Sequence, residues 1–405
     1  MRVLVAMSGG VDSSVAAALL ADRLGPGQVV GATLKLWGGA SDSGCCSVAD
    51  VDDARRVADQ LGLVHHVFNF AAAFEEHVVE PYVRGHAEGR TPNPCIECNR
   101  HLKFDRLVER AIDLGFDAVA TGHHARRTVT DDGRFRLCRG ADPGKDQSYV
   151  LAMLGQGQLA RSLFPVGEMT KEDVRAEARR LGLRTADKPD SQDVCFIRSD
   201  EGRSGFLGDR VALHPGRLVD DATGEELGAV GAVELVTVGQ RRGMGHSGDG
   251  RRRFVTAVDV PARRVMVGPP EAAYAPEVAL HTVTWVDADP TAGAAGATGA
   301  AGAVGATGAV GATGAAGATG AAGAAGAAGA AGAAGATGTD GTVGTVAVVA
   351  QCSAHGAPVP ARVTRSEGGL VVRFARPQRR IAPGQTVALY DPSRPDEVVG
   401  SGIAR

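Results

Sequence analysis

Met7–Ser14 holds the residue types that a loop needs to bind a phosphate, reading MSGGVDSS between an apolar run and a helical pattern. Gly9 and Gly10 remove side chains where the backbone must turn sharply and approach an anion. The amides of such a turn, the positive end of the next helix and the serine hydroxyls all favour anions. Asp12 either caps that helix or holds Mg2+ on the phosphates. A plain glycine turn would not need three serines in this order, so we expect a phosphate loop.

Three of the seven cysteines lie in segments that suggest sulfur chemistry. Cys95 and Cys98 lie in TPNPCIECN, where the prolines favour an extended approach to the thiols, and Cys195 lies in DSQDVCFI. A helix from Asn99 onward would place its positive end near Cys98 and lower the pKa of that thiol. A nucleophilic thiolate beside a nucleotide site predicts sulfur transfer.

Alternating strand and helix patterns in the first half of the chain must position these residues. The predicted strands are Val3–Ala6, Val29–Leu36, Val64–Phe68 and Asp117–Thr121. The predicted helices are Asp12–Leu24, one capped by Ser47 with Asp50, Arg100–Leu114, and one opened by Thr170 with Asp173. This alternation predicts an α/β fold with a mostly parallel, doubly wound sheet, whose ligands lie at the carboxyl ends of the strands.

Beyond about residue 205, short β-branched runs replace the helical periodicity. These runs are Val233–Val238, Phe254–Val258, Val265–Val267, Val278–Trp285, Val343–Ala350, Leu370–Phe374 and Val387–Tyr390. They predict small antiparallel domains or barrels. We therefore expect a catalytic domain over 1–204, a small β-rich central domain over 205–270, and a C-terminal β-barrel over 271–405.

The last domain contains an insert, at about residues 293–344, in which glycine recurs at every third position. The period matches collagen, but the insert has no proline, which a triple helix would need in quantity. We expect a disordered loop of glycine, alanine and threonine between two strands, without a catalytic role.

The formal net charge of −3 means that any contact with nucleic acid must come from local patches. Two arginine groups offer such patches, although a solvated loop would explain them equally well: Arg251, Arg252 and Arg253, then Arg376, Arg379 and Arg380. No apolar stretch reaches the length of a membrane span. With an odd number of cysteines and no export signal, we expect a cytoplasmic protein with reduced thiols and no membrane partner.

Several motifs together carry a family resemblance. The phosphate loop resembles that of the N-type ATP pyrophosphatases, which have an adenine nucleotide alpha hydrolase-like fold. Six further motifs resemble those of the tRNA-specific 2-thiouridylases: GRTPNP (89–94), ATGHHAR (120–126), GKDQSY (144–149), LFPVGE (163–168), DSQDVCFI (190–197) and GQRRGMG (239–245). The resemblance covers nearly the whole chain apart from the insert.

The resemblance implies an enzyme, a tRNA-uridine 2-sulfurtransferase that thiolates wobble uridine 34 with ATP and Mg2+. Adenylation of the C2 oxygen would release pyrophosphate, and a persulfide on Cys195 would then replace AMP. Cys98 would act as the nucleophile that resolves the adduct through a transient Cys98–Cys195 disulfide. By the same resemblance ATP would contact Ala6, Met7, Ser8, Gly9, Gly10, Val11, Asp12, Ser13, Leu34 and Gly122. The target base would meet Asn93, Pro94 and Cys95, and tRNA would meet His123, Lys145, Asp146, Gln147 and Gln385.

Two departures from the family pattern keep alternatives open. Many members carry Asp at the position of Cys95, so Cys95, Cys98 and Cys195 also resemble the three ligands of a 4Fe–4S cluster in other tRNA thiolases. Ser353 and Ala354 stand where we align an Arg–Tyr tRNA contact, and that contact is not transferred. A ligase or amidotransferase would share the phosphate loop but should lack the paired cysteines. The expected partners are tRNAs for Lys, Glu and Gln, and a cysteine desulfurase or sulfur-relay protein as sulfur donor. We expect the protein to be a monomer.

Overall fold

A computed structural model of the chain describes residues 1–37, 48–190, 194–198, 200–246, 248, 250–292 and 344–405. The expected helix cap Ser47 and residues 293–343 of the repeat insert lie outside this description. Within it, no helix has both the length and the apolar character that crossing a membrane requires.

The N-terminal sheet is parallel throughout, with strands in the order β3-β2-β1-β4-β7. Its strands are β1 (Val3–Ala6), β2 (Val29–Lys35), β3 (Val64–Asn69), β4 (Ala118–Ala120) and β7 (Ser162–Leu163). The central strand β1 is covered on both faces because its side chains alternate between two cores: Val5 joins one apolar cluster and Leu4 the other. The predicted doubly wound α/β sheet is confirmed.

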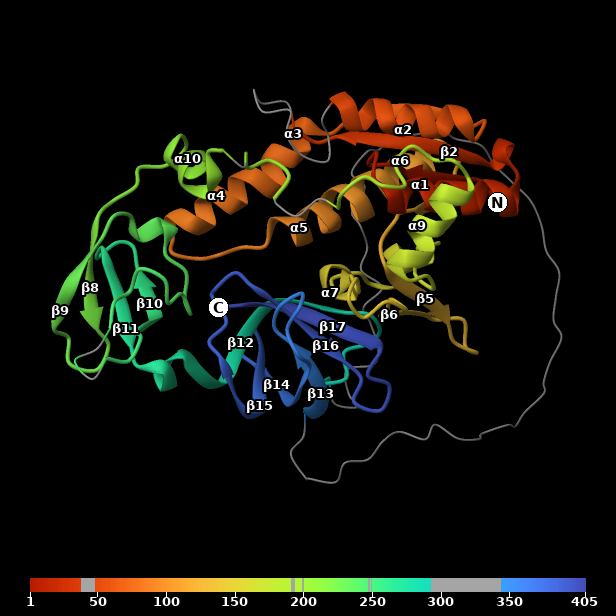
Figure 1. Ribbon diagram of the computed structural model, residues 1–405. Coiled ribbons are helices and arrows are strands. Elements are labelled where there is room, and N and C mark those ends of the chain that lie inside the picture. The colour runs from red at the N-terminus through yellow and green to blue at the C-terminus, as the bar shows by residue number, and fades with distance from the viewer. Residues whose placement is uncertain (38–47, 191–193, 199, 247, 249, 293–343) are drawn as a thin grey trace, which may run out of the picture.

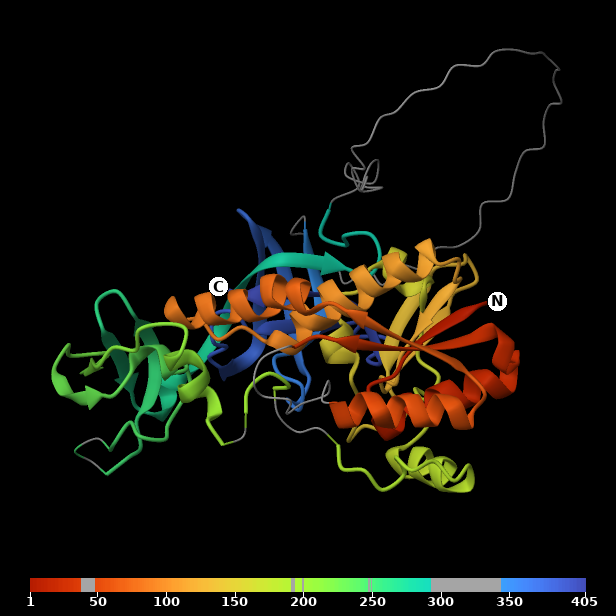
Figure 2. The same ribbon diagram turned by 90° about the horizontal axis from the view of Figure 1, so that it is seen from above.

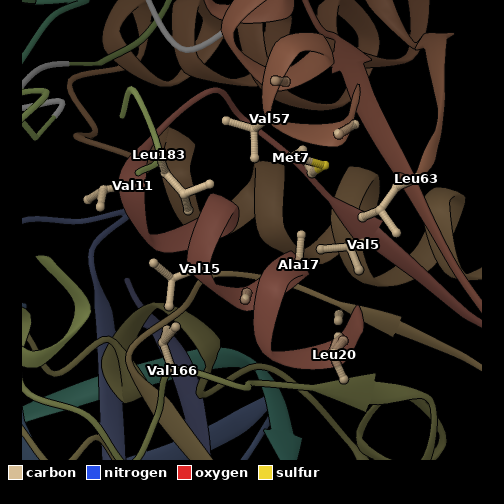
Figure 3. Close-up of a cluster of buried hydrophobic side chains, with 14 of the residues drawn as sticks. Val5, Met7, Val11, Val15, Ala17, Leu20, Val57, Leu63, Val166 and Leu183 are labelled. Carbon is tan, nitrogen blue, oxygen red and sulfur yellow. The ribbon is translucent and has the colours of Figure 1, made fainter. Parts of the chain in front are cut away.

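Helices cover both faces of this sheet (Figure 1). One face carries α1 (Val11–Leu24), α2 (Val48–Gln60) and α9 (Lys171–Arg180), whose apolar side chains pack around Val5 and Met7 (Figure 3). The other face carries α3 (Ala71–Phe74), α4 (Glu80–Ala87), α5 (Pro94–Glu97) and α6 (Leu107–Asp113), with π-helical segments Glu75–Val79 and Cys98–Arg106 between them.

The helix that carries the cysteines begins earlier than the sequence predicts. It starts at Pro94, which is suited to a first helical turn, and runs through the π-helical segment to Asp113. The prediction of a helix start near Asn99 is therefore wrong. The positive end of the helix lies at Cys95 rather than at Cys98, so the reason given for an acidic Cys98 thiol does not hold.

A small mixed sheet forms the central domain, with strands in the order β10-β11-β8-β9. Strand β11 pairs with β8 in parallel, so the prediction of an antiparallel domain is wrong for this sheet. Its strands are β8 (Gly216–Asp220), β9 (Glu226–Val230), β10 (Phe254–Asp259) and β11 (Arg264–Gly268), preceded by α10 (Gly202–Gly208). It lies at the opposite end of the molecule from the N-terminal sheet, with α4 between them (Figure 2). The strand predicted at Val233–Val238 is wrong, because Val233–Leu235 forms a 3-10 turn that buries Val233.

The C-terminal strands form the predicted β-barrel. They are β12 (Tyr274–Trp285), β13 (Thr345–Gln351), β14 (Val359–Ser366), β15 (Gly369–Arg379), β16 (Thr386–Tyr390) and β17 (Glu397–Ala404). Their order is β12-β15-β14-β13-β16-β17, and pairing of β12 with β17 closes the barrel.

A hairpin from the first half of the chain, which the sequence patterns did not predict, joins this barrel. It consists of β5 (Ala125–Val129) and β6 (Phe135–Arg139), followed by α7 (Ser148–Leu151) and α8 (Gln156–Ala160). Strand β6 pairs with β17 through Cys138 opposite Glu397 and Leu137 opposite Val398. The barrel sheet therefore continues into a hairpin from the N-terminal half of the chain, while the parallel sheet remains separate (Figure 1).

Candidate active site

The loop between β1 and α1 has the geometry of an anion-binding turn. Gly10 is the N-cap of α1 in extended conformation, and the hydroxyls of Ser13 and Ser14 both donate to its carbonyl, at 3.1 and 2.8 Å. Gly9 has φ +74°, and a Cβ there would lie 2.3 Å from the Asp50 carbonyl oxygen. The backbone path thus requires glycine at position 9, as the sequence predicted. It does not require glycine at position 10, where a Cβ would meet only the Ser8 hydroxyl, at 3.4 Å.

Asp12 does not cap α1, because the N-cap is Gly10, so the prediction of a capping role for Asp12 is wrong. Its carboxylate accepts hydrogen bonds from Lys171 Nζ, 2.8 Å from each oxygen, and its Oδ1 lies 3.1 Å from His124 Nε2. Burial alone would raise the pKa of Asp12, but the hydrogen bonds from His124 and Lys171 outweigh it and hold the pKa below its usual value.

A second carboxylate, Asp190, gathers further cations beside the loop. Its oxygens lie 2.8 Å from Lys145 Nζ and 2.8 Å from Lys171 Nζ, and Arg175 Nη2 lies 3.2 Å away. Burial opposes ionisation, but the two lysines dominate and lower the pKa of Asp190 to about 2. The carboxylate therefore stays charged and fixes both ammonium groups.

A third ammonium group lies on the other side of the phosphate loop. Lys188 Nζ donates to the Gly9 carbonyl at 3.0 Å and pairs with Asp50 and Asp53 at 2.6 and 2.8 Å. Burial would lower the pKa of Lys188, but the two carboxylates raise it above its usual value. This lysine is positively charged at neutral pH and lies where it can meet a phosphate.

These groups line a cavity of about 570 Å3, a size suited to a nucleotide. Of the predicted ATP contacts, all except Gly9 line it: Ala6, Met7, Ser8, Gly10, Val11, Asp12, Ser13, Leu34 and Gly122. It also takes the predicted tRNA contacts His123, Lys145, Asp146 and Gln147. Gly122 fits only because it lacks a side chain, since a Cβ would lie 2.5 Å from the Ser13 nitrogen.

His123 is buried and uncharged. Its Nδ1 lies 2.7 Å from Thr121 Oγ1, and its ring packs against Phe104 and Phe164. Burial, with the charge of Lys103 as a smaller cause, lowers the pKa of His123 well below its usual value. The imidazole therefore offers a neutral surface to whatever enters the cavity.

The cysteines lie outside the described lining of this cavity. Cys98 is buried in the apolar cluster on the α4–α6 face, and Cys195 is half-buried and packs against the same cluster. Cys95 is exposed, and its amide donates to the side chain of Asn93 at 3.1 Å. Lys103, from the π-helical segment that begins at Cys98, reaches the cavity lining.

The segment that leads to Cys95 rests on the barrel. Thr91 N donates to the Pro383 carbonyl at 2.7 Å, and the Gln385 side chain donates to the Thr91 carbonyl. Gly384 leaves no room for a side chain, since a Cβ would lie 3.0 Å from Pro92 N. Gln385, which is predicted to contact tRNA, thus positions the segment that precedes Cys95 and Cys98.

Sequence patterns missed Lys171, Lys188, His124 and Asp190 as site residues. One signal was available: Lys171 is the first residue of α9, after the N-cap Thr170, where the helix dipole disfavours a cation. A lysine at that position suggests that it has an anionic partner. Lys188 and Asp190 lie in a segment without periodicity, and only the fold brings them to the phosphate loop.

The two arginine patches lie around the central sheet and the barrel. Arg251 pairs with Glu271, and Arg252 is exposed. Arg379 and Arg380 line a second cavity, of about 290 Å3, between β10 and the barrel. Arg379 and Arg380 thus lie at the junction of the central domain and the barrel, and none of the six arginines lines the cavity at the phosphate loop.

Family profiles match most of the chain in consecutive segments. Residues 1–199 match the tRNA methyl transferase HUP domain, 204–269 the tRNA methyl transferase PRC-barrel domain, and 337–404 the aminomethyltransferase beta-barrel domain. Residues 291–348 match the collagen triple helix repeat, which has the same glycine period as the insert.

Curated relatives match over the full length. The chain is 39% identical to tRNA-specific 2-thiouridylase MnmA of Chloroflexus aurantiacus, over all of this chain and 98% of that protein. It is 40% identical to the protein of the same name from Mycobacteroides abscessus, over 100% and 99%. For that of Mycolicibacterium smegmatis the identity is 49%, over 67% and 76%. Among solved structures, the NH3-dependent NAD synthetase of Campylobacter jejuni is 17% identical over 47% of this chain and 69% of that one, with a TM-score of only 0.30.

Proposed function

The chain belongs to the tRNA-specific 2-thiouridylase family and is a tRNA sulfurtransferase, and from this membership we propose how its residues perform the reaction. The substrate is wobble uridine 34 of tRNA, whose C2 oxygen is replaced by sulfur. The observation that carries the proposal is one helix: it brings Cys98 to the cluster that also holds Cys195, while its Lys103 lines the cavity at the phosphate loop.

In the first step the C2 oxygen attacks the α-phosphorus of ATP, and pyrophosphate leaves. Backbone amides at the start of α1 bind phosphate oxygens, and Lys171 and Lys188 neutralise the charge that develops on pyrophosphate. Because Asp12, Asp50 and Asp190 now hold these lysines, phosphate binding exchanges carboxylate partners for phosphate oxygens.

In the second step sulfur replaces AMP. The terminal sulfur of a Cys195 persulfide attacks C2, and AMP, a far better leaving group than oxide, departs. The Cys98 thiolate then attacks the Cys195 sulfur, which forms the Cys98–Cys195 disulfide and releases the thiolated base. The location of both thiols in one apolar cluster supports this pairing.

The described residues suit Mg2+ better than a 4Fe–4S cluster. Asp12, beside the phosphate loop, would hold Mg2+, which screens the phosphate charge. For a 4Fe–4S cluster the fit is poor, because the described His, Cys, Asp and Glu residues form no group of three with metal-binding geometry. Cys95 is exposed whereas Cys98 is buried in the apolar cluster.

Further residues recognise the target base and the tRNA. Asn93, Pro94 and Cys95 meet the target base, and His123, Lys145, Gln147 and Gln385 contact tRNA, with units at 1–204, 205–270 and 271–405. The tRNAs are those for Lys, Glu and Gln, and the sulfur comes from a cysteine desulfurase or sulfur-relay protein. We place this monomer in the cytoplasm, where thiols stay reduced.

The test separates activation from sulfur transfer. Cys195→Ser should still release pyrophosphate from ATP in the presence of tRNA but should form no 2-thiouridine. Cys138→Ser, which changes a buried cysteine on β6, is the matched control and should thiolate normally. Thiolation by Cys195→Ser would rule out the persulfide route.

A second measurement addresses the cluster alternative. Protein purified without oxygen is assayed for iron, for sulfide and for thiolation of unmodified tRNA, alongside Cys95→Ala. Activity without iron, retained in Cys95→Ala, is the expected result. Iron-dependent activity that requires Cys95 would favour the 4Fe–4S cluster over the Cys195 persulfide as the sulfur carrier.

A further inference from the structure

We propose that Arg139 is a positioning residue for tRNA binding, because it ties together two loops that both form part of the rim of the active-site cavity. One rim is 144–147, from the nucleotide-binding half, and the other is 353–355, from the barrel. The inference rests on the proposed function, since it concerns how the same cavity receives the anticodon loop.

The first rim is held from behind by Asp146. Its carboxylate accepts hydrogen bonds from Gly140 N at 3.0 Å, from Ser148 N and Ser148 Oγ at 2.9 Å each, and from Arg139 Nη1 at 2.8 Å. The side chain is only 8% exposed. These contacts occupy both oxygens, so Asp146 shapes the loop that presents Lys145 and Gln147, in place of a direct contact with tRNA.

Arg139 connects this carboxylate to the barrel. Its guanidinium lies 3.9 Å from the centre of the Tyr390 ring on β16, and its Nη2 donates to Gln351 Oε1 at 2.8 Å. The Tyr390 hydroxyl lies 3.0 Å from Ser148 Oγ, which already donates to Asp146. A planar group with several fixed donors suits this position, and lysine cannot reproduce it.

Gln351 passes the connection to the second rim. It is buried at the end of β13, and its Nε2 donates to the carbonyls of Ser353 and Ala354, at 3.0 Å each. Ala354 and the exposed His355 line the cavity. An unbroken series of hydrogen bonds therefore runs from one rim through Asp146, Arg139 and Gln351 to the other.

This series of hydrogen bonds fixes the distance between the two rims. Binding of the nucleotide at the phosphate loop does not depend on it. The phosphate loop joins β1 to α1, and α9 supplies its Lys171. The side chain of Arg139 contacts none of these elements. Loss of the connection should therefore widen or misplace the entrance for RNA while leaving the ATP site intact. His355, which is exposed and lines the cavity, is the side chain that this connection positions for RNA.

The experiment compares Arg139→Lys with Arg136→Lys in thiolation assays that titrate tRNA and ATP separately. Arg136 is the matched control: it also lies on β6 and pairs with Asp287, at 3.0 Å, and with Glu397, but it reaches neither rim. Arg139→Lys should raise KM for tRNA about tenfold and leave KM for ATP within twofold of wild type. Arg136→Lys should change neither, and thermal unfolding should confirm that both variants fold.

Two further variants test the connection itself. Gln351→Leu should raise KM for tRNA as Arg139→Lys does, and the double variant should be no worse than either single one, since both break one series. An isolated anticodon stem-loop should suffer the same loss as whole tRNA. Unchanged KM for tRNA in Arg139→Lys, or additive effects of Arg139→Lys and Gln351→Leu, would overturn the inference. Absence of ATP-dependent thiolation in the wild type would instead count against the proposed function.

Discussion

The ammonium group of Lys171 lies 2.8 Å from both carboxylate oxygens of Asp12, so the first residue of α9 is bound to the second residue of α1. The same ammonium contacts Asp190. Two carboxylates therefore share one cation directly beside the phosphate loop, and phosphate binding must compete with them.

Lys171→Met should abolish most ATP activation, because the variant lacks the cation that meets the leaving pyrophosphate. Loss of one such preorganised donor lowers a rate by roughly 100-fold or more. The measurement is tRNA-dependent release of pyrophosphate. Arg179→Met, on the exposed side of the same helix, is the control and should react normally. An unchanged rate in Lys171→Met would remove this lysine from the active site.

Gly9→Ala should impair ATP binding and lower the free energy of unfolding by about 1–3 kcal/mol. Residue 9 has φ +74°, and the new methyl group would lie 2.3 Å from the Asp50 carbonyl oxygen, which is backbone and cannot rotate away. Gly27→Ala meets no atom within 4 Å and is the control. Equal unfolding free energies for the two variants, from urea titrations, would contradict this account of the loop.

Burial of His86 should make the protein less stable in mild acid. Burial, together with the charge of Arg203, lowers the pKa of His86 to about 4, although a hydrogen bond to the Glu234 carbonyl opposes the shift. As pH falls from about 6.5, the unfolded chain binds this proton first, so stability is lost between pH 6.5 and pH 4. The loss amounts to about 3 kcal/mol at the acid end.

His86→Leu should remove this part of the pH dependence, as measured by the free energy of unfolding at pH 7, 5.5 and 4.5. The variant also loses the hydrogen bond to Glu234, so its stability at pH 7 is lower, and only the change with pH is diagnostic. Parallel pH profiles for the two proteins would show that His86 does not carry the effect.

Removal of residues 293–343 should leave activity unchanged. The flanking residues lie together, since a Cβ at Gly344 would be 3.6 Å from the Thr291 carbonyl oxygen, so a Gly-Asn-Gly turn can replace the insert. Shortening the connection between two strands lowers the entropic cost of closing it by about 0.6 kcal/mol per halving, so stability should not fall. A rise in KM for tRNA in the deletion variant would assign the insert a part in RNA binding.

Local patterns predicted the fold well where the cause is local. The capping box of Thr170 and Asp173 marks the start of α9, and the structure has both of its hydrogen bonds. The pairing of β6 with β17 could not be predicted, because the partner strand lies at the end of the chain. The role of Lys188 could not be predicted for the same reason, because its ion pair with Asp50 depends on how α2 packs.

Within the candidate active site, the sequence predicted the phosphate loop but not the residues that hold the cavity rim in place. Gly9 and Gly10 belong to a motif that dictates its own backbone, whereas Arg139 and Gln351 belong to none. Their hydrogen bond joins positions separated by 212 residues. Such contacts follow only from the packed arrangement of the barrel against the hairpin.

The sharing of a sheet between hairpin and barrel has a consequence for synthesis on the ribosome. Arg126 on the hairpin and Asp396, just before the last strand, pair although they are 270 residues apart. At roughly 5–20 residues per second, the hairpin waits on the order of 15 to 50 seconds for its partner. A nascent or truncated chain without residues 396–404 can form neither this ion pair nor the sheet that the hairpin shares with the barrel.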